Sequence, residues 1–183
     1  MARAVGITSI VVTDDTDADA ARLAGFIDIA IGRSAAAGTA ANAASAYGLA
    51  PGSRPVMSVE GEVVAVKHVA EGEGVSYGYT YRTREPTSLA LVGLGYSDGI
   101  PRLASNRAEA LLSGCRRPVV GRIAMDQLVL DCGSDDPVAG DIVTLFGDPA
   151  RGEPSASEWA AWTERSALEL TAGLGVRILR EAR

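Results

Sequence analysis

Three short motifs contain the side chains of this sequence that are best suited to catalysis or ligand binding. They are Gly74-Val-Ser-Tyr-Gly78, Gly95-Tyr-Ser-Asp-Gly99 and Gly121-Arg-Ile-Ala-Met-Asp-Gln127. Tyr77 carries a phenol with a reference pKa of about 10, so it acts as a base at neutral pH only where a nearby cation or strong donor lowers that pKa. An isolated tyrosine in such a segment is otherwise a half-buried strand residue with a hydrogen-bonded hydroxyl.

The other polar and sulfur-containing residues of these motifs also have ordinary structural interpretations. Met125 could fill a gap in the core, Asp126 beside it could cap a turn, and Tyr96 could be an exposed turn residue. The single lysine, Lys67, and the single histidine, His68, are adjacent in a predicted strand, so their side chains point to opposite faces. A strand histidine without a catalytic role is the favoured interpretation of His68.

In their order and spacing, the three motifs resemble the C-terminal domain of alanine racemases. These are the pyridoxal-phosphate enzymes that interconvert L- and D-alanine for peptidoglycan synthesis. The resemblance runs from about Tyr47 to Arg183. It includes the further segments Tyr47-Gly-Leu-Ala-Pro51, Arg54-Pro-Val-Met-Ser58, Gly152-Glu-Pro-Ser-Ala-Ser-Glu-Trp159 and Val176-Arg-Ile-Leu-Arg180.

The resemblance implies a role for four residues of the motifs. Tyr77 matches the tyrosine that removes the α-proton from one face of the substrate, while a lysine serves the other face. Met125 matches the methionine whose backbone amide binds the substrate carboxylate, and Asp126 shapes the same pocket. Tyr96 resembles the tyrosine at the substrate entrance. The expected catalytic residue is therefore Tyr77, and the expected substrate-binding residues are Met125, Asp126 and Tyr96.

The sequence departs from the family in two respects. The family's cofactor lysine lies in a barrel strand that this chain does not contain, and Lys67 falls where the family carries no cofactor. We therefore expect no cofactor in this chain alone, and pyridoxal phosphate only where a partner barrel is present. Some racemases also place a tyrosine in the last strand, where this chain has Leu174, Gly175 and Val176.

Length and composition exclude several other classes of protein. The chain has 183 residues, fewer than the roughly 250 that a (β/α)8 barrel alone needs. Its formal charge of −6 argues against a nucleic-acid or anionic-membrane partner. It lacks a long apolar run and a signal pattern, so we expect a cytoplasmic protein. Cys115 and Cys132 have neither a disulfide framework nor metal-ligand spacing.

Glycine and proline residues punctuate the chain at short intervals after Arg54, which is typical of a mainly β domain. Ser155 and Glu158 form a capping box that predicts a helix start. A second short helix is predicted for Ala167–Leu170. The predicted strands are Val56–Val69, Tyr79–Arg82, Ser88–Gly95, Ala108–Leu112, Pro118–Ile123, Gln127–Cys132, Asp141–Leu145 and Val176–Leu179.

Residues 1–50 have a different, alanine- and aspartate-rich composition. Strands are predicted for Ile7–Val12 and Phe26–Ile31, with a helix over Asp17–Ala24 between them and an alanine-rich stretch, Ser34–Ala46, after them. This α/β segment is either a remnant of the racemase barrel or an unrelated appendage. Residues 51–183 are predicted to form a barrel-like β domain of the alanine racemase C-terminal type.

Two hypotheses about function follow. In the first, the chain belongs to an isomerase and supplies the tyrosine base and carboxylate contacts to a pyridoxal-phosphate barrel, being inactive alone. In the second, it is a non-catalytic domain, derived from alanine racemase, that binds a partner or a small ligand. Because an isolated domain of this type would expose an apolar, tyrosine-bearing face, we expect a homodimer or a complex with a separate racemase barrel.

Overall fold

The chain divides into two units, Met1–Ser53 and Arg54–Arg183. The computed structural model describes residues 9–12, 28–31, 44, 47–49 and 52–181. In the first unit, β1 (Ser9–Val12) and β2 (Asp28–Ile31) pair in parallel and lie within the two strands predicted there. The predicted helix Asp17–Ala24 and almost all of the alanine-rich stretch lie outside the described residues.

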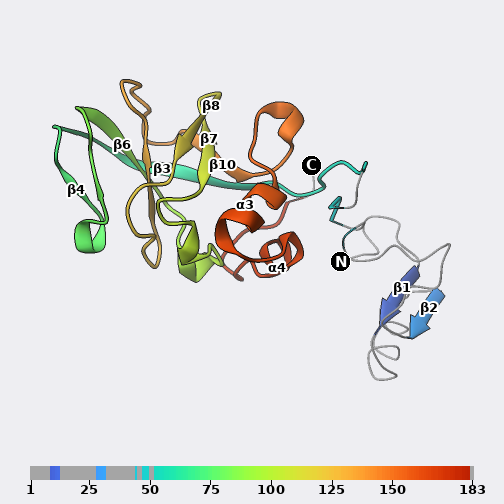
Figure 1. Ribbon diagram of the computed structural model, residues 1–183. Coiled ribbons are helices and arrows are strands. Elements are labelled where there is room, and N and C mark those ends of the chain that lie inside the picture. The colour runs from blue at the N-terminus through green and yellow to red at the C-terminus, as the bar shows by residue number, and fades with distance from the viewer. Residues whose placement is uncertain (1–8, 13–27, 32–43, 45–46, 50–51, 182–183) are drawn as a thin grey trace. The chain divides into compact units, whose positions relative to one another are not determined.

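The second unit is built on a six-stranded sheet in the order β8-β7-β10-β3-β6-β9, with every pair antiparallel (Figure 1). An antiparallel bridge between Val119 and Leu130 connects the two outer edges, so the sheet is nearly closed. This confirms the mainly β, barrel-like prediction. The strands are β3 (Val59–Val69), β6 (Thr87–Val92), β7 (Glu109–Leu112), β8 (Cys115–Pro118), β9 (Leu128–Asp131) and β10 (Ile142–Phe146).

Strand β3 changes partner along its length. Its first residues, Val59 to Glu62, pair with β10, whereas Val63 to Val69 pair with β6, with a register shift after Val63. Within the strand only Val59 and Val63 are buried. The strand therefore shows no regular alternation of buried and exposed residues along its length.

Trp159 lies in the core between the sheet and the C-terminal helices. Its side chain is fully buried, its ring centroid is 6.1 Å from that of Phe146, and its Nε1 donates to the carbonyl of Glu109 at 3.1 Å. A buried indole needs such an acceptor because an unpaired N–H in the core is costly. The sheet supplies most of the other large, fully buried side chains, which include Val59, Val63, Val92, Leu112, Leu128, Leu130 and Leu145.

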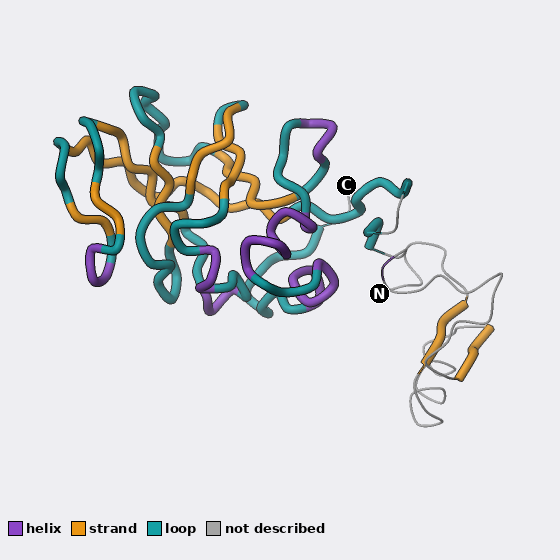
Figure 2. Tube along the Cα trace, in the orientation of Figure 1, coloured by secondary structure: helices purple, strands orange, loops and turns teal. Residues whose placement is uncertain are grey.

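The two α-helices described in the second unit both begin at capping boxes. In α3 (Ala156–Thr163) the Ser155 side chain accepts from the backbone of Glu158, and the Glu158 side chain accepts from the backbone of Ser155. In α4 (Ala167–Ala172) Ser166 and Glu169 make the same reciprocal bonds. The predicted helix start at Ser155 is therefore confirmed. Figure 2 shows long loops between the helices and strands. The motifs lie on such loops and on the short 3-10 turns η2 (Tyr77–Tyr79) and η3 (Tyr96–Asp98).

Three predicted strands differ from the observed structure. The segment predicted as Tyr79–Arg82 is strand only at β5 (Tyr81–Arg82), which pairs with β4 (Gly74–Val75). The segment predicted as Pro118–Ile123 is mostly loop, because the strand β8 lies earlier. The predicted strand Val176–Leu179 is wrong: these residues form a turn and loop after α4. No helix in the described part of the chain combines the length and apolarity needed to cross a membrane.

Candidate functional site

Tyr77 lies on a short 3-10 turn, η2 (Tyr77–Tyr79), between β4 and β5. The turn is tight, since Ser76, Gly78 and Tyr79 all have positive φ. The Tyr77 side chain is 71% exposed, and its hydroxyl makes no hydrogen bond to any residue that the structure describes. The interpretation as a half-buried strand tyrosine with a paired hydroxyl is therefore wrong.

The Tyr77 turn, residues 76–80, is anchored to the third motif by one side chain of the turn itself and one from a loop outside it. Ser76 Oγ donates to the carbonyl of Arg122 at 2.6 Å. Asn106 Nδ2 donates to Thr80 Oγ1 at 3.1 Å, and Asn106 Oδ1 accepts from the Gly121 amide at 2.6 Å. Asn106 thus links both segments.

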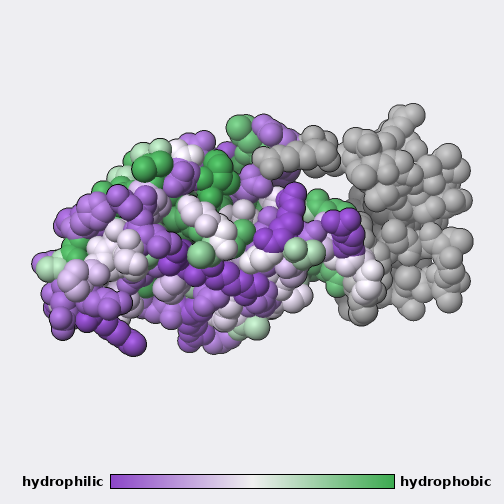
Figure 3. Space-filling view, turned by 90° about the horizontal axis from the view of Figure 1, so that it is seen from above, coloured by the Kyte–Doolittle hydropathy of each residue, from purple (hydrophilic) through white to green (hydrophobic). Residues whose placement is uncertain are grey.

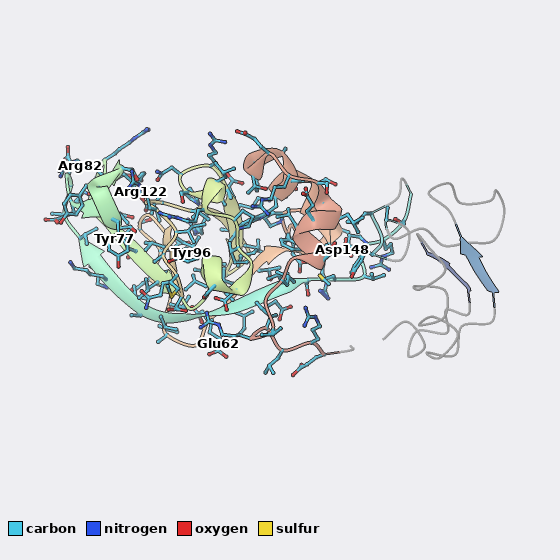
Figure 4. The ribbon with its side chains drawn as sticks, turned by 90° about the horizontal axis from the view of Figure 1, so that it is seen from below. Glu62, Tyr77, Arg82, Tyr96, Arg122 and Asp148 are labelled. Atoms are coloured by element: carbon cyan, nitrogen blue, oxygen red, sulfur yellow. The ribbon has the colours of Figure 1, made fainter. Side chains whose placement is uncertain are left out.

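Arg122 places a positive charge beside the Tyr77 turn. Three atoms of its guanidinium lie 3.4–3.9 Å from the point where a Cβ on Gly78 would stand. Figure 4 shows the Arg122 side chain near Tyr77, at the β4 end of the domain. No role was predicted for Arg122, and its place in the third motif is the only sign of it in the sequence.

The second and third motifs meet backbone to backbone. Residues 95–99, the Tyr96 turn, include η3 (Tyr96–Asp98), and residues 124–127 form the Met125 turn. Tyr96 N–H donates to the Ala124 carbonyl at 3.0 Å, and Ser97 N–H donates to the Met125 carbonyl at 2.9 Å. Gly95 allows this approach, because a Cβ there would lie 2.3 Å from the Met125 carbonyl oxygen.

The Met125 turn presents backbone donors on the protein surface. The Met125 side chain is 54% exposed, so it does not fill a gap in the core. Among the described residues, the N–H groups of Met125 and Asp126 have no hydrogen-bond acceptor. The Tyr96 ring is 39% exposed, and the Arg102 guanidinium lies 5.4 Å from its centroid. Two adjacent free amide groups of this kind suit an anionic ligand such as a carboxylate.

Asp126 is held by Arg177 and Ser97. Arg177 Nη2 donates to Asp126 Oδ1 at 2.7 Å, and Ser97 Oγ donates to the same oxygen at 3.0 Å. These two hydrogen bonds, that from Arg177 first, hold the pKa of Asp126 below its usual value. The same guanidinium also donates to Asp98 of the second motif. Asp126 therefore does more than cap a local turn.

Lys67, His68 and the two cysteines make no side-chain hydrogen bond to the three motifs within the described residues. Lys67 is exposed on β3, where its backbone lies opposite Leu89 of β6. The next residue, His68, has its Nδ1 3.0 Å from Ser88 Oγ. Cys115 is exposed and Cys132 is buried, and burial raises the pKa of the Cys132 thiol. Within the described residues there is no group of histidine, cysteine, aspartate or glutamate side chains that could hold a metal ion.

The comparison with protein families gives a match over most of the chain. The family model described as the C-terminal domain of alanine racemase matches residues 56–182. The alanine racemase of Salinispora arenicola is 51% identical over 121 residues, which cover 62% of this chain and 32% of that protein. The alanine racemase of Frankia casuarinae is 45% identical over 146 residues, which cover 74% of this chain and 38% of that protein.

Solved structures show the same relationship. The alanine racemase of the D-cycloserine-producing Streptomyces lavendulae matches with a TM-score of 0.73 and 39% identity, over 85% of this chain and 41% of that one. The alanine racemase of Streptomyces coelicolor A3(2) gives a TM-score of 0.73 and 40% identity, over 84% of this chain and 40% of that one. The chain thus spans between about a third and two-fifths of the length of the relatives it matches.

Proposed function

Because this chain belongs to the family of alanine racemase C-terminal domains, we propose that it supplies a tyrosine base and substrate-carboxylate contacts to a pyridoxal-phosphate barrel. The barrel would complete a site that interconverts L- and D-alanine. The chain's own residues do not fit the cofactor, since Lys67 is its single lysine and is exposed on a strand. In this proposal the barrel supplies the lysine and the phosphate contacts.

One observation carries the proposal. The Met125 turn offers two unpaired backbone N–H groups in the described structure, and the exposed Tyr77 has an unpaired hydroxyl. Backbone donors are fixed in place before a ligand arrives, so binding a carboxylate costs little reorganisation. Hydrogen bonds between the three motifs hold the turns in place. Those bonds do not use the Tyr77 hydroxyl or the two N–H groups of the Met125 turn, so these groups are available to a partner.

Tyr77 would move the proton on one face of the substrate. Racemisation requires a base on each face, since a single base would have to cross the plane of the carbanion to return the proton. Tyr77 would supply one base, and the barrel lysine would supply the other. When bound to the barrel, pyridoxal phosphate would supply the electron sink that stabilises the carbanion.

The exposed side chains around the motifs fit a surface that a partner covers. Tyr77 is 71% exposed, Tyr79 64%, Met125 54% and Leu103 47%. Figure 3 shows apolar side chains on one face of the described β domain. Tyr77 and Tyr79 lie on the same turn, and exposed large side chains that cluster in this way usually mark an interaction site. We propose a separate racemase barrel as the partner, or a second copy of this chain, and sedimentation should detect a species larger than the monomer. A strictly monomeric chain would contradict the homodimer.

The test is reconstitution of the racemase reaction. The purified chain is assayed for alanine racemisation with pyridoxal phosphate, alone and mixed with a lysine-bearing racemase barrel. We expect activity only in the mixture. Tyr77→Phe should lower kcat at least about a hundredfold, the usual contribution of a positioned acid or base. Tyr79→Phe is the matched control, because it removes a second exposed hydroxyl from the same turn and should leave kcat unchanged.

Each other outcome has a defined meaning. Lack of activity in the mixture, with both proteins folded, would exclude the catalytic role and leave the non-catalytic binding domain as the function. Activity of the chain alone would show that Lys67 serves the cofactor and would overturn the division of roles. Equal losses in Tyr77→Phe and Tyr79→Phe would assign the effect to the fold of the turn rather than to the Tyr77 hydroxyl.

A further inference from the structure

Arg177 connects two loops that lie far from it in the sequence. It lies in a turn at residues 176–177, a few residues after the end of α4. Its Nε and Nη2 donate to Asp98 Oδ1 at 3.1 and 2.9 Å, and Nη2 also donates to Asp126 Oδ1 at 2.7 Å. Nη2 further contacts Ser97 Oγ. One guanidinium therefore binds both the Tyr96 turn and the Met125 turn.

The backbone of the C-terminal tail, residues 173–180, holds Arg177 at this position. Gly175 N–H donates to the Asp98 carbonyl at 2.8 Å. The chains approach closely, since a Cβ on Gly99 would lie 2.4 Å from the Gly173 carbonyl oxygen and one on Gly175 would lie 2.9 Å from the Ser97 carbonyl oxygen. The tail is thus docked on the Tyr96 turn, and the Arg177 side chain extends from it to the Met125 turn.

The two carboxylates that Arg177 joins differ in their surroundings. The Asp98 side chain is 8% exposed and also accepts from the Gly95 amide at 2.9 Å, so it is fixed within the Tyr96 turn. The Asp126 side chain is 55% exposed, and its described partners are Ser97 and Arg177. A guanidinium presents several donors in a rigid plane, so it can bind both carboxylates at once, whereas an ammonium is a point charge.

We infer that Arg177 is a positioning residue that holds the Met125 turn against the Tyr96 turn, in the geometry that presents the Met125 amide to a substrate carboxylate. Arg177 itself is neutralised by Asp98 and Asp126 and acts through them. The kinetic consequence rests on the proposed function. Because the carboxylate is bound in the ground state as well as in the transition state, loss of Arg177 should raise KM more than it lowers kcat.

The first experiment uses the chain alone and does not depend on activity. The sequence has three methionines, so selective ¹³C-methyl labelling yields a simple spectrum in which Met125→Leu identifies the Met125 signal. Arg177→Met should shift or broaden that signal. Arg180→Met is the matched control, since Arg180 lies on the same tail and its Nη2 donates only to the tail carbonyl of Leu174 among the described residues. An unchanged Met125 signal in Arg177→Met, or equal changes in both variants, would overturn the inference.

The second experiment measures steady-state kinetics with the lysine-bearing barrel. Arg177→Met should raise KM for alanine about fivefold or more with kcat within about twofold, and Arg177→Lys should recover part of the loss. Arg180→Met should match the wild type. A fall in kcat with unchanged KM would overturn the positioning role. If the wild-type mixture is inactive, the proposed function fails, and the Met125 signal alone decides whether Arg177 holds the turn.

Should Arg177→Met fail to fold, Arg177→Lys replaces it in both experiments. The lysine ammonium in this variant can still contact one carboxylate, so the buried Asp98 keeps a positive charge beside it. The Met125 signal should then differ from the wild type, because an ammonium does not reproduce the planar fork of the guanidinium. A wild-type signal and a wild-type KM in Arg177→Lys, with Arg177→Met unfolded, would count as evidence for charge alone and against the positioning role.

Discussion

Gly95 shows how a single residue permits the candidate site. Its φ of −146° is open to any residue, so glycine is needed there for space and not for backbone freedom. A side chain at this position would meet the carbonyls of Met125 and Ala124 at 2.3 and 2.5 Å. The atoms in the way are backbone, which cannot rotate aside as a side chain can.

We predict that Gly95→Ala destabilises the domain by about 1–3 kcal/mol, the usual cost of overpacking, and separates the Tyr96 and Met125 turns. Gly114→Ala is the control, since Gly114 has a φ of 78° and open space around its Cβ position. That variant should cost about 1 kcal/mol of backbone strain. Urea unfolding measures both costs, and the Met125 methyl signal should change only in Gly95→Ala. A change in both variants would contradict the steric argument.

Asn106 is a second residue whose effect can be isolated. Its φ is 59°, a conformation that glycine adopts freely, so Asn106→Gly removes the side-chain hydrogen bonds without adding strain. We expect a loss of about 1 kcal/mol in the free energy of unfolding, because the Gly121 amide loses its acceptor. Asn106→Asp keeps that acceptor and should lose less. Equal losses of unfolding free energy in Asn106→Gly and Asn106→Asp would show that the hydrogen bond to Gly121 does not account for the stability that Asn106 contributes.

At the scale of elements, the site is carried by turns that rigid elements hold in place. The Tyr77 turn joins β4 to β5, and the Tyr96 turn follows β6. Turn residues expose backbone and side-chain groups that a strand would use for pairing, so turns are where ligand contacts are commonly found. The helices contribute differently: α3 covers the core through Trp159, and its capping box fixes where it begins.

The capping box at α3 supports a prediction at this scale. Ser155→Ala should lower the free energy of unfolding by about 1 kcal/mol, because the Glu158 amide loses its acceptor at the helix start. Ser157→Ala is the matched control: Ser157 is exposed inside the helix, and alanine there should be neutral or stabilising by a few tenths of a kcal/mol at most. Thermal and urea unfolding compare the two variants. A larger loss in Ser157→Ala would contradict the role of the cap.

At the scale of the whole β domain, Asp131 joins distant parts of the chain. Tyr81 Oη donates to Asp131 Oδ2 at 2.6 Å, Thr87 Oγ1 also donates to this carboxylate, and the Gly133 amide donates at 3.1 Å. Burial acts to raise the pKa of Asp131, but these three hydrogen bonds outweigh it, so the pKa lies below its ordinary value. The hairpin β4–β5 is thereby tied to the end of β9.

This contact makes stability depend on pH in the alkaline range. Burial, followed by the hydrogen bond to Asp131, raises the pKa of Tyr81 from 10.0 to about 12. The contribution of Tyr81 is therefore fully present below pH 10.0, the unfolded value, and is lost as the pH rises through about 12. We expect the difference in unfolding free energy between wild type and Tyr81→Phe to shrink over this range.

The pH prediction has an independent check. The difference in tyrosinate absorbance between wild type and Tyr81→Phe should titrate near pH 12 in the folded protein. Tyr79→Phe provides the control for removal of an exposed phenol from the neighbouring turn. A Tyr81 titration at its ordinary value, or a stability difference that stays constant up to the unfolding pH, would show that the Asp131 contact does not form in solution.

The sequence by itself determined the features that depend on near neighbours. The glycine and proline spacing predicted a mainly β domain. Ser155 with Glu158 predicted the start of α3, because a capping box depends on only four consecutive residues. The order of the motifs predicted the alanine racemase C-terminal fold. It also selected Tyr77, Tyr96, Met125 and Asp126, whose assigned roles remain predictions.

The tertiary structure alone decided which motifs meet and which residues hold them. Arg177 binds Asp98 across 79 positions of sequence, and Asn106 links the Tyr77 turn to Gly121. The predicted strand Val176–Leu179 became a turn because Gly175 docks on Asp98 and the Arg177 guanidinium binds the loops beside it. Local patterns report the intrinsic preference of a segment, whereas these contacts form only after the sheet has brought distant turns together.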